Sequence, residues 1–302
     1  MIIFNTQYNK NIYVSQQVNS NRTLYIVPTP IGNLHDITYR ALSTLRQVDG
    51  IIAESTRRVQ ILLSFFSIKL PVYIMNRYNE NRKVPILLSK LQDGRNIALI
   101  SDAGSPLISD PGYRLVRACH EKKIKVISLP GPCAAIAALC GSGLPVNRFC
   151  FEGFLPSKRI FRISRLKELL EESRTLIFYD VKYRIIDSLK DIVSVFGETR
   201  YVVLVRELSK IWEFIYGAPA SKLLFWVQQD KTRVKGEIVL VVSGYNFKNR
   251  GNDEIPPKAW SIMKLLALEV SVKKAASLVG NIYGIKKNVL YHKYVFEKLN
   301  RK

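Results

Sequence analysis

The sequence has few of the residues that build metal centres and disulfide frameworks. It contains four cysteines and three histidines in 302 residues, and the cysteines have no CxxC spacing and no histidines near them in a regular pattern. Zinc sites and disulfide-stapled folds show regular spacings of these residues. We therefore expect no metal site, no disulfide framework and reduced, buried thiols.

Long apolar runs are also missing. No run reaches the roughly 18–20 apolar residues that span a bilayer. The first 21 residues are rich in Asn and Gln, and they lack the apolar core of about 7–15 residues that a secretory signal needs. We expect residues 1–21 to be a disordered extension of a cytoplasmic protein that has no membrane association.

Three common motifs of nucleotide sites and hydrolases are absent. No GxGxxG follows the first predicted strand, where Gly32 stands alone, and neither GxxxxGK(S/T) nor GxSxG occurs. Their absence argues against a Rossmann dinucleotide site, a P-loop and a serine nucleophile elbow.

Acidic residues are scarce. There are 24 Asp and Glu against 46 Lys and Arg, which gives a formal net charge of +22. A field of this sign favours a polyanion, and nucleic acid is the commonest one in a cytoplasm. The abundance of Asn, Ile, Tyr and Lys also fits a genome-wide drift towards lysine, so the charge alone leaves both interpretations open.

The residues that are present are organised around Asn96–Pro111 (NIALISDAGSPLISDP). An apolar run, Ile97–Ile100, is short enough for a buried strand, and small residues with proline predict a tight turn at Ser101–Pro106. A second turn, Ser109–Gly112, is predicted to cap the next helix. Open α/β sheets bind ligands where a carboxylate and a glycine loop follow a buried strand.

Short apolar runs alternate with helical patterns from residue 23 to residue 140, which predicts a mostly parallel sheet. Because the carboxyl ends of parallel strands share one edge, four loops should meet there: Pro28–Asn33, Glu54–Arg57, Ser101–Pro106 and Pro130–Ala135. Such loops offer backbone amides and apolar surface to a ligand of modest charge. S-adenosylmethionine has this chemistry.

The second half predicts another α/β domain with its own, mixed sheet. The full predicted division is a disordered extension (1–21), an N-terminal α/β domain with the ligand loops (22–142), a second α/β domain (143–246), a linker (247–257) and basic C-terminal helices (258–302). In the last segment, apolar spacing around a turn at Tyr283–Ile285 predicts a helix-turn-helix.

Several stretches together resemble one known family. The resemblance rests on LYIVPTPIGNLHDIT (24–38), ALISDAGSPLISDPGYRLVRAC (98–119), LPGPCAAIAAL (129–139), RFCFEGFLPSK (148–158), TLIFYD (175–180), VVLVREL (202–208), KGEIVLVV (235–242) and the tail KKAASLVGNIYGIKKNVLY (273–291). These are similar to the tetrapyrrole methylase superfamily of class III methyltransferases. More narrowly, they resemble its bacterial small-subunit (16S) rRNA cytidine ribose 2′-O-methyltransferases.

This resemblance implies S-adenosylmethionine in a cleft between the two α/β domains, and a homodimer. The implied cofactor-binding residues are Pro30, Gly32, Asp102, Ala103, Gly104, Ser105, Pro106, Gly131, Pro132, Cys133, Ala134 and Ala135 from the first domain, and Phe178, Tyr179, Arg206, Glu207, Gly236 and Glu237 from the second. Relatives usually have Glu-Asp-Thr-Arg at 54–57 and Tyr-Glu-Ser-x-His-Arg at 179–184. This chain has Ser55 in place of the acid and Tyr183 in place of the histidine.

The implied reaction is in-line attack of an RNA ribose hydroxyl on the sulfonium methyl group, helped mainly by proximity and alignment. A general base would add about 10²–10⁴-fold. The candidates are Glu54, Asp102, Asp180, Glu207 and Lys158 as a neutral amine, with Asp102, Glu54 and Lys158 preferred as catalytic residues. Structural alternatives remain open, because Asp102 could cap its own loop, Glu54 could pair with Arg57, and Arg206-Glu207 could form an interdomain ion pair.

Two basic segments are candidates for binding RNA: Lys158, Arg159, Arg162 and Arg165 on one predicted helix, and Lys273, Lys274, Lys286 and Lys287 in the tail. Each set could instead be a solvated face, and the tail could bind a ribosomal protein or pack on the catalytic body. Small-subunit rRNA within a ribosomal subunit is the expected partner. Two other functions stay open: a methylase of tetrapyrrole-like small molecules, and a non-catalytic RNA-binding assembly protein.

Overall fold

The structure is a computed structural model, and it describes residues 22–245, 255 and 257–299. The chain divides into two compact units, Met1–Tyr245 and Asn246–Lys302. The predicted extension at 1–21 and nearly all of the predicted linker at 247–257 lie outside the described residues.

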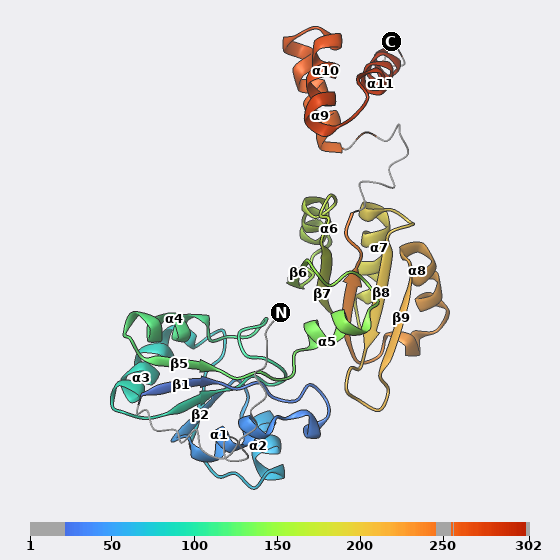
Figure 1. The fold of residues 1–302 in the computed structure, drawn as a ribbon. Coiled ribbons are helices and arrows are strands. Elements are labelled where there is room, and N and C mark those ends of the chain that lie inside the picture. Colours follow the sequence, from blue (N-terminus) through green and yellow to red (C-terminus); the bar gives the residue numbers. More distant parts are fainter. Residues whose placement is uncertain (1–21, 246–254, 256, 300–302) are drawn as a thin grey trace, which may run out of the picture. The chain divides into compact units, whose positions relative to one another are not determined.

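The first sheet lies in the N-terminal half of the first unit and has five strands, all parallel, in the order β3-β2-β4-β1-β5 (Figure 1). Its strands are β1 (Thr23–Ile26), β2 (Gly50–Ala53), β3 (Val72–Ile74), β4 (Ile97–Leu99) and β5 (Lys125–Ser128). The helices between them are η1 (Leu34–Asp36), α1 (Tyr39–Gln47), α2 (Thr56–Phe65), α3 (Glu80–Gln92) and α4 (Tyr113–Glu121). The predicted parallel sheet is confirmed.

Both faces of this sheet are covered by helices, which is why its strands are short continuous apolar runs. Alternate residues of β1 show the two faces: Tyr25 packs in a cluster with α1 and α2, and Leu24 packs in a cluster with α3 and α4. With both faces buried, the side left open to a ligand is the edge where the strands end and the loops begin.

The second sheet is mixed, in the order β6-β7-β10-β8-β9, with β6 parallel to β7 and the other pairs antiparallel. Its strands are β6 (Phe149–Phe154), β7 (Thr175–Val181), β8 (Tyr201–Arg206), β9 (Phe214–Pro219) and β10 (Glu237–Val242). The elements between them are α6 (Arg159–Glu168), α7 (Ile185–Phe196), α8 (Ala220–Gln229) and η2 (Lys231–Val234). The expected pair of α/β domains, parallel and then mixed, is confirmed.

Helices α6, α7 and α8 cover one face of the second sheet, where Leu166, Leu189 and Leu223 join its buried core. The other face is covered by α5 (Ala134–Gly141), through Ala138 and Leu139. The predicted division at 142/143 places α5 in the first domain, whereas its apolar side chains pack on the second sheet. This helix therefore joins the edge of the first sheet to the face of the second.

The second unit contains α9 (Pro257–Glu269), α10 (Val272–Tyr283) and α11 (Lys287–Leu299). Ser271 caps α10 by accepting a hydrogen bond from the Lys274 amide, and Gly284 ends it in the left-handed conformation with φ 65°. Glycine is the residue that adopts this turn at little cost. The small core includes Met263 and Leu290, and the predicted helix-turn-helix is confirmed.

No helix of the described residues is both long enough and apolar enough to cross a membrane.

Candidate active site

A cavity of about 610 Å³ lies between the carboxyl edge of the first sheet and the α5-covered face of the second. Ile31, Asp102 and Cys133 line it from loops of the first sheet, and Tyr179 and Val239 line it from the second sheet. Small-molecule sites usually measure about 300–1,000 Å³. The two α/β domains thus enclose a space of the size that a small cofactor needs.

The loops of the first sheet are tied to one another. The backbone groups of Thr29 and Gly104 exchange two hydrogen bonds of 2.9 and 3.0 Å, and Ser105 donates through its hydroxyl to the Pro132 carbonyl over 2.9 Å. Gly104 has φ +82°, a conformation that L side chains rarely adopt. These bonds hold the loops in one arrangement, so the cavity wall is largely preformed.

An acidic and basic cluster forms the second-domain wall. Glu207 follows β8 with φ 53°, accepts the Glu237 amide over 2.8 Å, and pairs with the Lys210 ammonium over 2.8 Å. Burial would raise the pKa of Glu207, but hydrogen bonds from Lys210 and the Glu237 amide lower it below its usual value. Gly236 has φ +94°, and a Cβ there would lie 2.3 Å from the Glu207 carboxyl carbon. Glycine at 236 is therefore required for this approach.

Tyr179 forms the middle of that wall. Its hydroxyl accepts the Ala135 amide over 3.2 Å, and its ring lies edge-on to Phe151 at 4.9 Å and to Phe154 at 5.4 Å. Burial raises the pKa of the Tyr179 phenol. It remains a neutral group that fixes the start of α5 against the second sheet.

Three predicted catalytic candidates carry identifiable partners. Asp102 lies 3.6 Å from the Arg58 guanidinium, and its carboxylate faces the cavity. Asp180 is buried against Arg184 at 2.5 Å, while its Oδ2 atom has no hydrogen-bond partner within the described part of the chain. The carboxyl group of Glu54 is hydrogen bonded to Asp110. It is not paired with Arg57, which was the structural alternative.

Two residues predicted to bind the cofactor face away from the cavity. Phe178 is only 1% exposed and packs in the core beneath α6 and α7. The Arg206 guanidinium donates to the carbonyls of Thr232 and Trp212, and Glu207 takes Lys210 as its ion-pair partner instead. Side chains alternate along a strand, so the neighbours of these residues, rather than they themselves, reach the cavity.

The other residues predicted to bind the cofactor fall into three groups. Pro30 and Gly32 line a smaller adjoining hollow of about 300 Å³, together with Asp102, Ala103 and Lys210. A second group shapes the loops without lining the cavity: Pro106 is buried, Gly131 packs on Pro28, Pro132 accepts from Ser105, and Ala135 donates to Tyr179. The third group lines the cavity: Asp102, Ala103, Gly104, Ser105, Cys133, Ala134, Tyr179, Glu207, Gly236 and Glu237.

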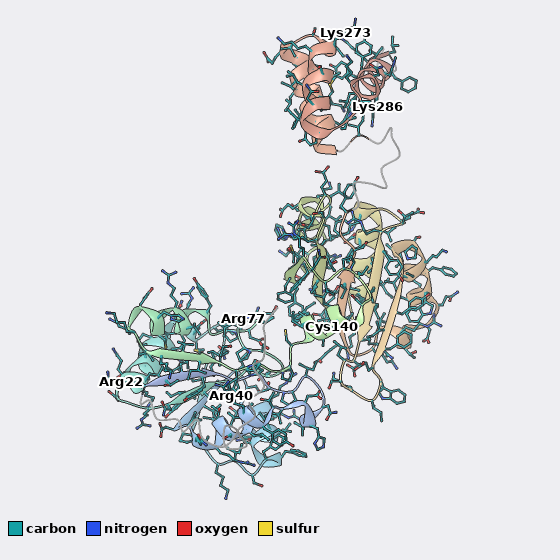
Figure 2. The ribbon with its side chains drawn as sticks, in the orientation of Figure 1. Arg22, Arg40, Arg77, Cys140, Lys273 and Lys286 are labelled. Carbon is teal, nitrogen blue, oxygen red and sulfur yellow. The ribbon has the colours of Figure 1, made fainter. Side chains whose placement is uncertain are left out.

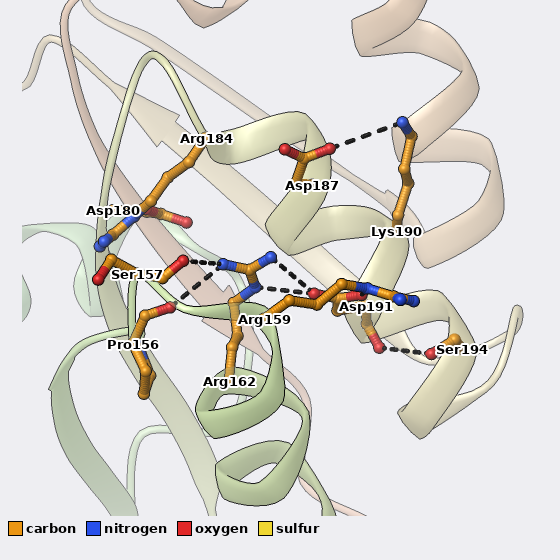
Figure 3. Close-up of polar contacts among 10 residues, drawn as sticks. All are labelled: Pro156, Ser157, Arg159, Arg162, Asp180, Arg184, Asp187, Lys190, Asp191 and Ser194. Atoms are coloured by element: carbon orange, nitrogen blue, oxygen red, sulfur yellow. Dashed lines mark hydrogen bonds and ion pairs between the residues drawn. The ribbon is translucent and has the colours of Figure 1, made fainter.

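The predicted basic row on α6 is wrong for Arg162. This side chain is 3% exposed and is bound to Asp191 over 2.7 Å (Figure 3). Arg159 also pairs with Asp191, at 3.0 Å, and Arg165 pairs with Glu152 at 2.5 Å. Acids of neighbouring elements therefore hold these three guanidinium groups.

The other basic candidates are exposed. Lys158 precedes α6 at the surface, and the four tail lysines are exposed on α10 and α11 or beside them. Figure 2 labels Lys273 and Lys286 in the C-terminal unit. This is the arrangement that the predicted RNA-binding role of Lys273, Lys274, Lys286 and Lys287 requires.

The sequence interpretation missed Asp110 and Lys210, both of which line the cavity. The sequence predicts that the turn containing Asp110 caps α4. In the structure the Glu80 carboxylate takes this role, since it accepts the amides of Gly112 at 3.0 Å and Arg114 at 3.2 Å. Nothing local in the sequence places Glu80 there. Among the described residues, no group of three or more His, Cys, Asp or Glu is arranged to hold a metal ion.

Comparison with known proteins identifies the family. The model for Tetrapyrrole (Corrin/Porphyrin) Methylases matches residues 23–223. The chain belongs to the tetrapyrrole methylase family. A model named RsmI C-terminal HTH domain matches residues 253–294, so the resemblance expected from the motifs is confirmed in both units.

Two relatives of this tetrapyrrole methylase carry the name Ribosomal RNA small subunit methyltransferase I. The one from Escherichia coli O157:H7 is 54% identical over 280 residues, covering 93% of this chain and 96% of the relative. The one from Haemophilus influenzae is 54% identical over 268 residues, covering 89% and 94%. The crystal structure of uroporphyrin-III-C-methyltransferase from Thermus thermophilus superposes with a TM-score of 0.53 at 17% identity, over 74% of this chain and 94% of that one. That likeness supports the fold.

Proposed function

We propose that this chain transfers the methyl group of S-adenosylmethionine to a cytidine ribose 2′-hydroxyl of small-subunit rRNA. The observation that carries the proposal is the cavity between the two sheets, in a chain 54% identical to a small-subunit rRNA methyltransferase over 93% of its length. The cytidine and its 2′-hydroxyl come from the resemblance of the motifs.

The cavity wall fits S-adenosylmethionine. Gly104 and Gly236 line the cavity with backbone alone, which suits an adenosine held by amides and apolar contacts. Carboxylates of Asp102, Glu207 and Glu237 offer acceptors for ribose hydroxyls and for the amino group of the methionine tail. When bound, the cofactor would supply an electrophilic methyl group on a sulfonium.

The rim of the cavity fits a nucleotide. Phe154 is 49% exposed and Tyr183 is 80% exposed, and both line the cavity together with Lys182. Unpaired RNA bases stack on aromatic side chains, and lysines contact the phosphates. Tyr183, which replaces the usual histidine, would keep a flat face for this stacking.

The residues of this chain then perform three tasks. The loops hold the reacting atoms in line, which is the main source of acceleration. Apolar side chains such as Ile31 and Val239 exclude water, which favours a step in which the sulfonium charge is lost. The exposed lysines of the C-terminal unit, with Lys158, bind rRNA phosphates.

The test is tritium transfer from labelled S-adenosylmethionine to small ribosomal subunits that lack the modification. We expect label in the rRNA and resistance of one linkage to alkaline cleavage, since a methylated 2′-oxygen cannot attack its phosphate. Cofactor binding with label only in an added tetrapyrrole would favour the small-molecule function. Absence of cofactor binding would favour the non-catalytic assembly protein.

The proposal also includes a cytoplasmic homodimer, in line with the family resemblance. Light scattering of the purified chain would measure twice the monomer mass of 34.5 kDa if the chain is a dimer.

A further inference from the structure

Asp110 is not the residue that caps α4, although its position suggests that role. It belongs to the second turn of the organising stretch, where an aspartate commonly caps the next helix. Glu80 already accepts the amides of Gly112 and Arg114 at the start of α4. The Asp110 carboxyl group instead faces the cavity.

A second carboxyl group lies against it. Glu54 follows β2, and its side chain is hydrogen bonded to Asp110. The Oε1 atom of Glu54 is buried and has no hydrogen-bond partner within the described residues. Two carboxyl groups in contact form a hydrogen bond only when one of them carries a proton, so this pair holds one proton rather than two full charges.

The surroundings raise the pKa of both carboxyl groups, so the pair keeps its proton at pH values close to neutral. Burial, and after it the charges of Asp110 and Asp102, raise the pKa of Glu54 to about 7 against the opposing effect of Arg77. Burial also raises the pKa of Asp110 to about 6, against hydrogen bonds from Glu54 and Ser101 and the charge of Arg77. Tyr179 faces Asp110 from the second sheet as a neutral phenol.

The other acids of the cavity are held by cations. Asp102 faces Arg58 at 3.6 Å, Asp180 is bound to Arg184 at 2.5 Å, and Glu207 is bound to Lys210 at 2.8 Å. A base that must accept a proton during the reaction works best when its charge is not already committed to an ion pair and its affinity for protons matches the working pH.

We propose that Asp110 is the general base that accepts the proton of the ribose 2′-hydroxyl, with Glu54 as the positioning residue that shares its proton. The proposal rests on the proposed function. As the O–H bond breaks towards Asp110, the hydroxyl oxygen bonds to the methyl carbon. The electron pair of the breaking C–S bond stays on sulfur, which leaves a neutral thioether. Asp110 then returns its proton to water.

The first experiment measures single-turnover transfer to small subunits by Asp110→Asn at saturating S-adenosylmethionine. We expect the rate to fall about 10²–10⁴-fold, the usual contribution of a general base, with cofactor affinity and melting temperature unchanged. Asp187→Asn is the matched control, since its side chain is 64% exposed on α7 and pairs with Lys190 at 3.6 Å. It should leave the rate unchanged.

The second experiment follows the pH dependence of Glu54→Gln. In the wild type the rate should rise with pH through about 6, as the pair loses the first of its two protons. In Glu54→Gln an amide replaces the protonated carboxyl group, which is the stronger hydrogen-bond donor and lowers the pKa of Asp110, so the rise should move to higher pH. A merely structural Glu54 would leave the midpoint where it was.

The outcomes separate the two proposals. A wild-type protein that transfers no methyl group to RNA overturns both of them. An active wild type with an equally active Asp110→Asn variant overturns only the base assignment. If Asp110→Asn fails to fold, the pH profile of Glu54→Gln decides, and an unmoved midpoint overturns the assignment.

Discussion

Replacing Arg162 by methionine would remove one half of a buried ion pair between α6 and α7. The Arg162 guanidinium donates to Asp191 through Nε over 2.8 Å and Nη2 over 2.7 Å, and through Nη1 to the carbonyls of Pro156 and Ser157 over 3.2 and 3.1 Å (Figure 3). The side chains are 3% and 2% exposed. Methionine leaves Asp191 charged and buried, with Arg159 as its remaining cation.

The size of the loss follows from this burial. Breaking one partner of a buried pair costs about 3–5 kcal/mol, because the other charge stays buried, here with only the largely exposed Arg159 to offset it. For a body of about 150–250 residues, 1 kcal/mol shifts the melting temperature by about 2–4 °C. We therefore expect Arg162→Met to melt about 6–20 °C below the wild type.

Calorimetry or circular dichroism on the full chain measures this shift. The matched control is Arg159→Met, which faces the same carboxylate with a side chain that is 71% exposed. Exposed pairs contribute about 0–1 kcal/mol, so this variant should melt within a few degrees of the wild type. Asp191→Leu combined with Arg162→Met should recover much of the loss, since apolar replacement of both partners is often neutral. Equal melting temperatures for the two single variants would refute the reasoning.

Three further results are expected. Tyr183→Ala should raise KM for the ribosomal subunit about 5–150-fold without changing stability, because base stacking contributes about 1–3 kcal/mol. An unchanged KM would contradict the stacking role of this 80% exposed ring. Lys286→Gln with Lys287→Gln should lower the salt dependence of RNA binding by about 0.7–0.9 per lost phosphate contact, and an unchanged slope would argue for a protein partner. Glu54→Gln should grow more stable relative to the wild type as pH rises from 4.5 to 7. In that range folded Glu54 retains a proton that the unfolded chain releases, so wild-type stability falls with pH. A constant difference in melting temperature across this range would contradict a raised pKa in the Glu54–Asp110 pair.

The fold could be predicted from local patterns because its strands are short apolar runs separated by helical periods. Ile97–Ile100 is predicted as a buried strand, and β4 falls within it. What local patterns could not supply is which element packs on which. Helix α5 has mostly small side chains and no clear apolar stripe, so nothing in its sequence indicates that it covers the second sheet.

The site was predicted in outline for the same reason. The turn residues after each strand of the first sheet identified the edge where Asp102–Ser105 and Cys133–Ala134 line the cavity. Errors arose where one strand residue was chosen over its neighbour. Phe178 and Tyr179 are adjacent, so they must face opposite sides of β7, and only the packing of α6 and α7 decides which one meets the core.

The net charge of a sequence does not show which basic side chains are exposed and unpaired, because that depends on the fold. Of the four basic residues expected to form an RNA-binding row on α6, Arg159 and Arg162 share Asp191, and Arg165 is held by Glu152 and Glu168. Arg162 is buried with its partner, whereas Arg159 and Arg165 are exposed side chains that each pair with an acid of the protein. The lysines of the C-terminal unit sit around a small core that is built from other residues, and the four candidates among them are exposed. The formal charge of +22 already subtracts the acids of these pairs, and it does not say where the unpaired cations lie. Residues 258–302 carry ten Lys and Arg against two Asp and Glu, so removing lysines there should change RNA binding and leave the catalytic cavity as it is.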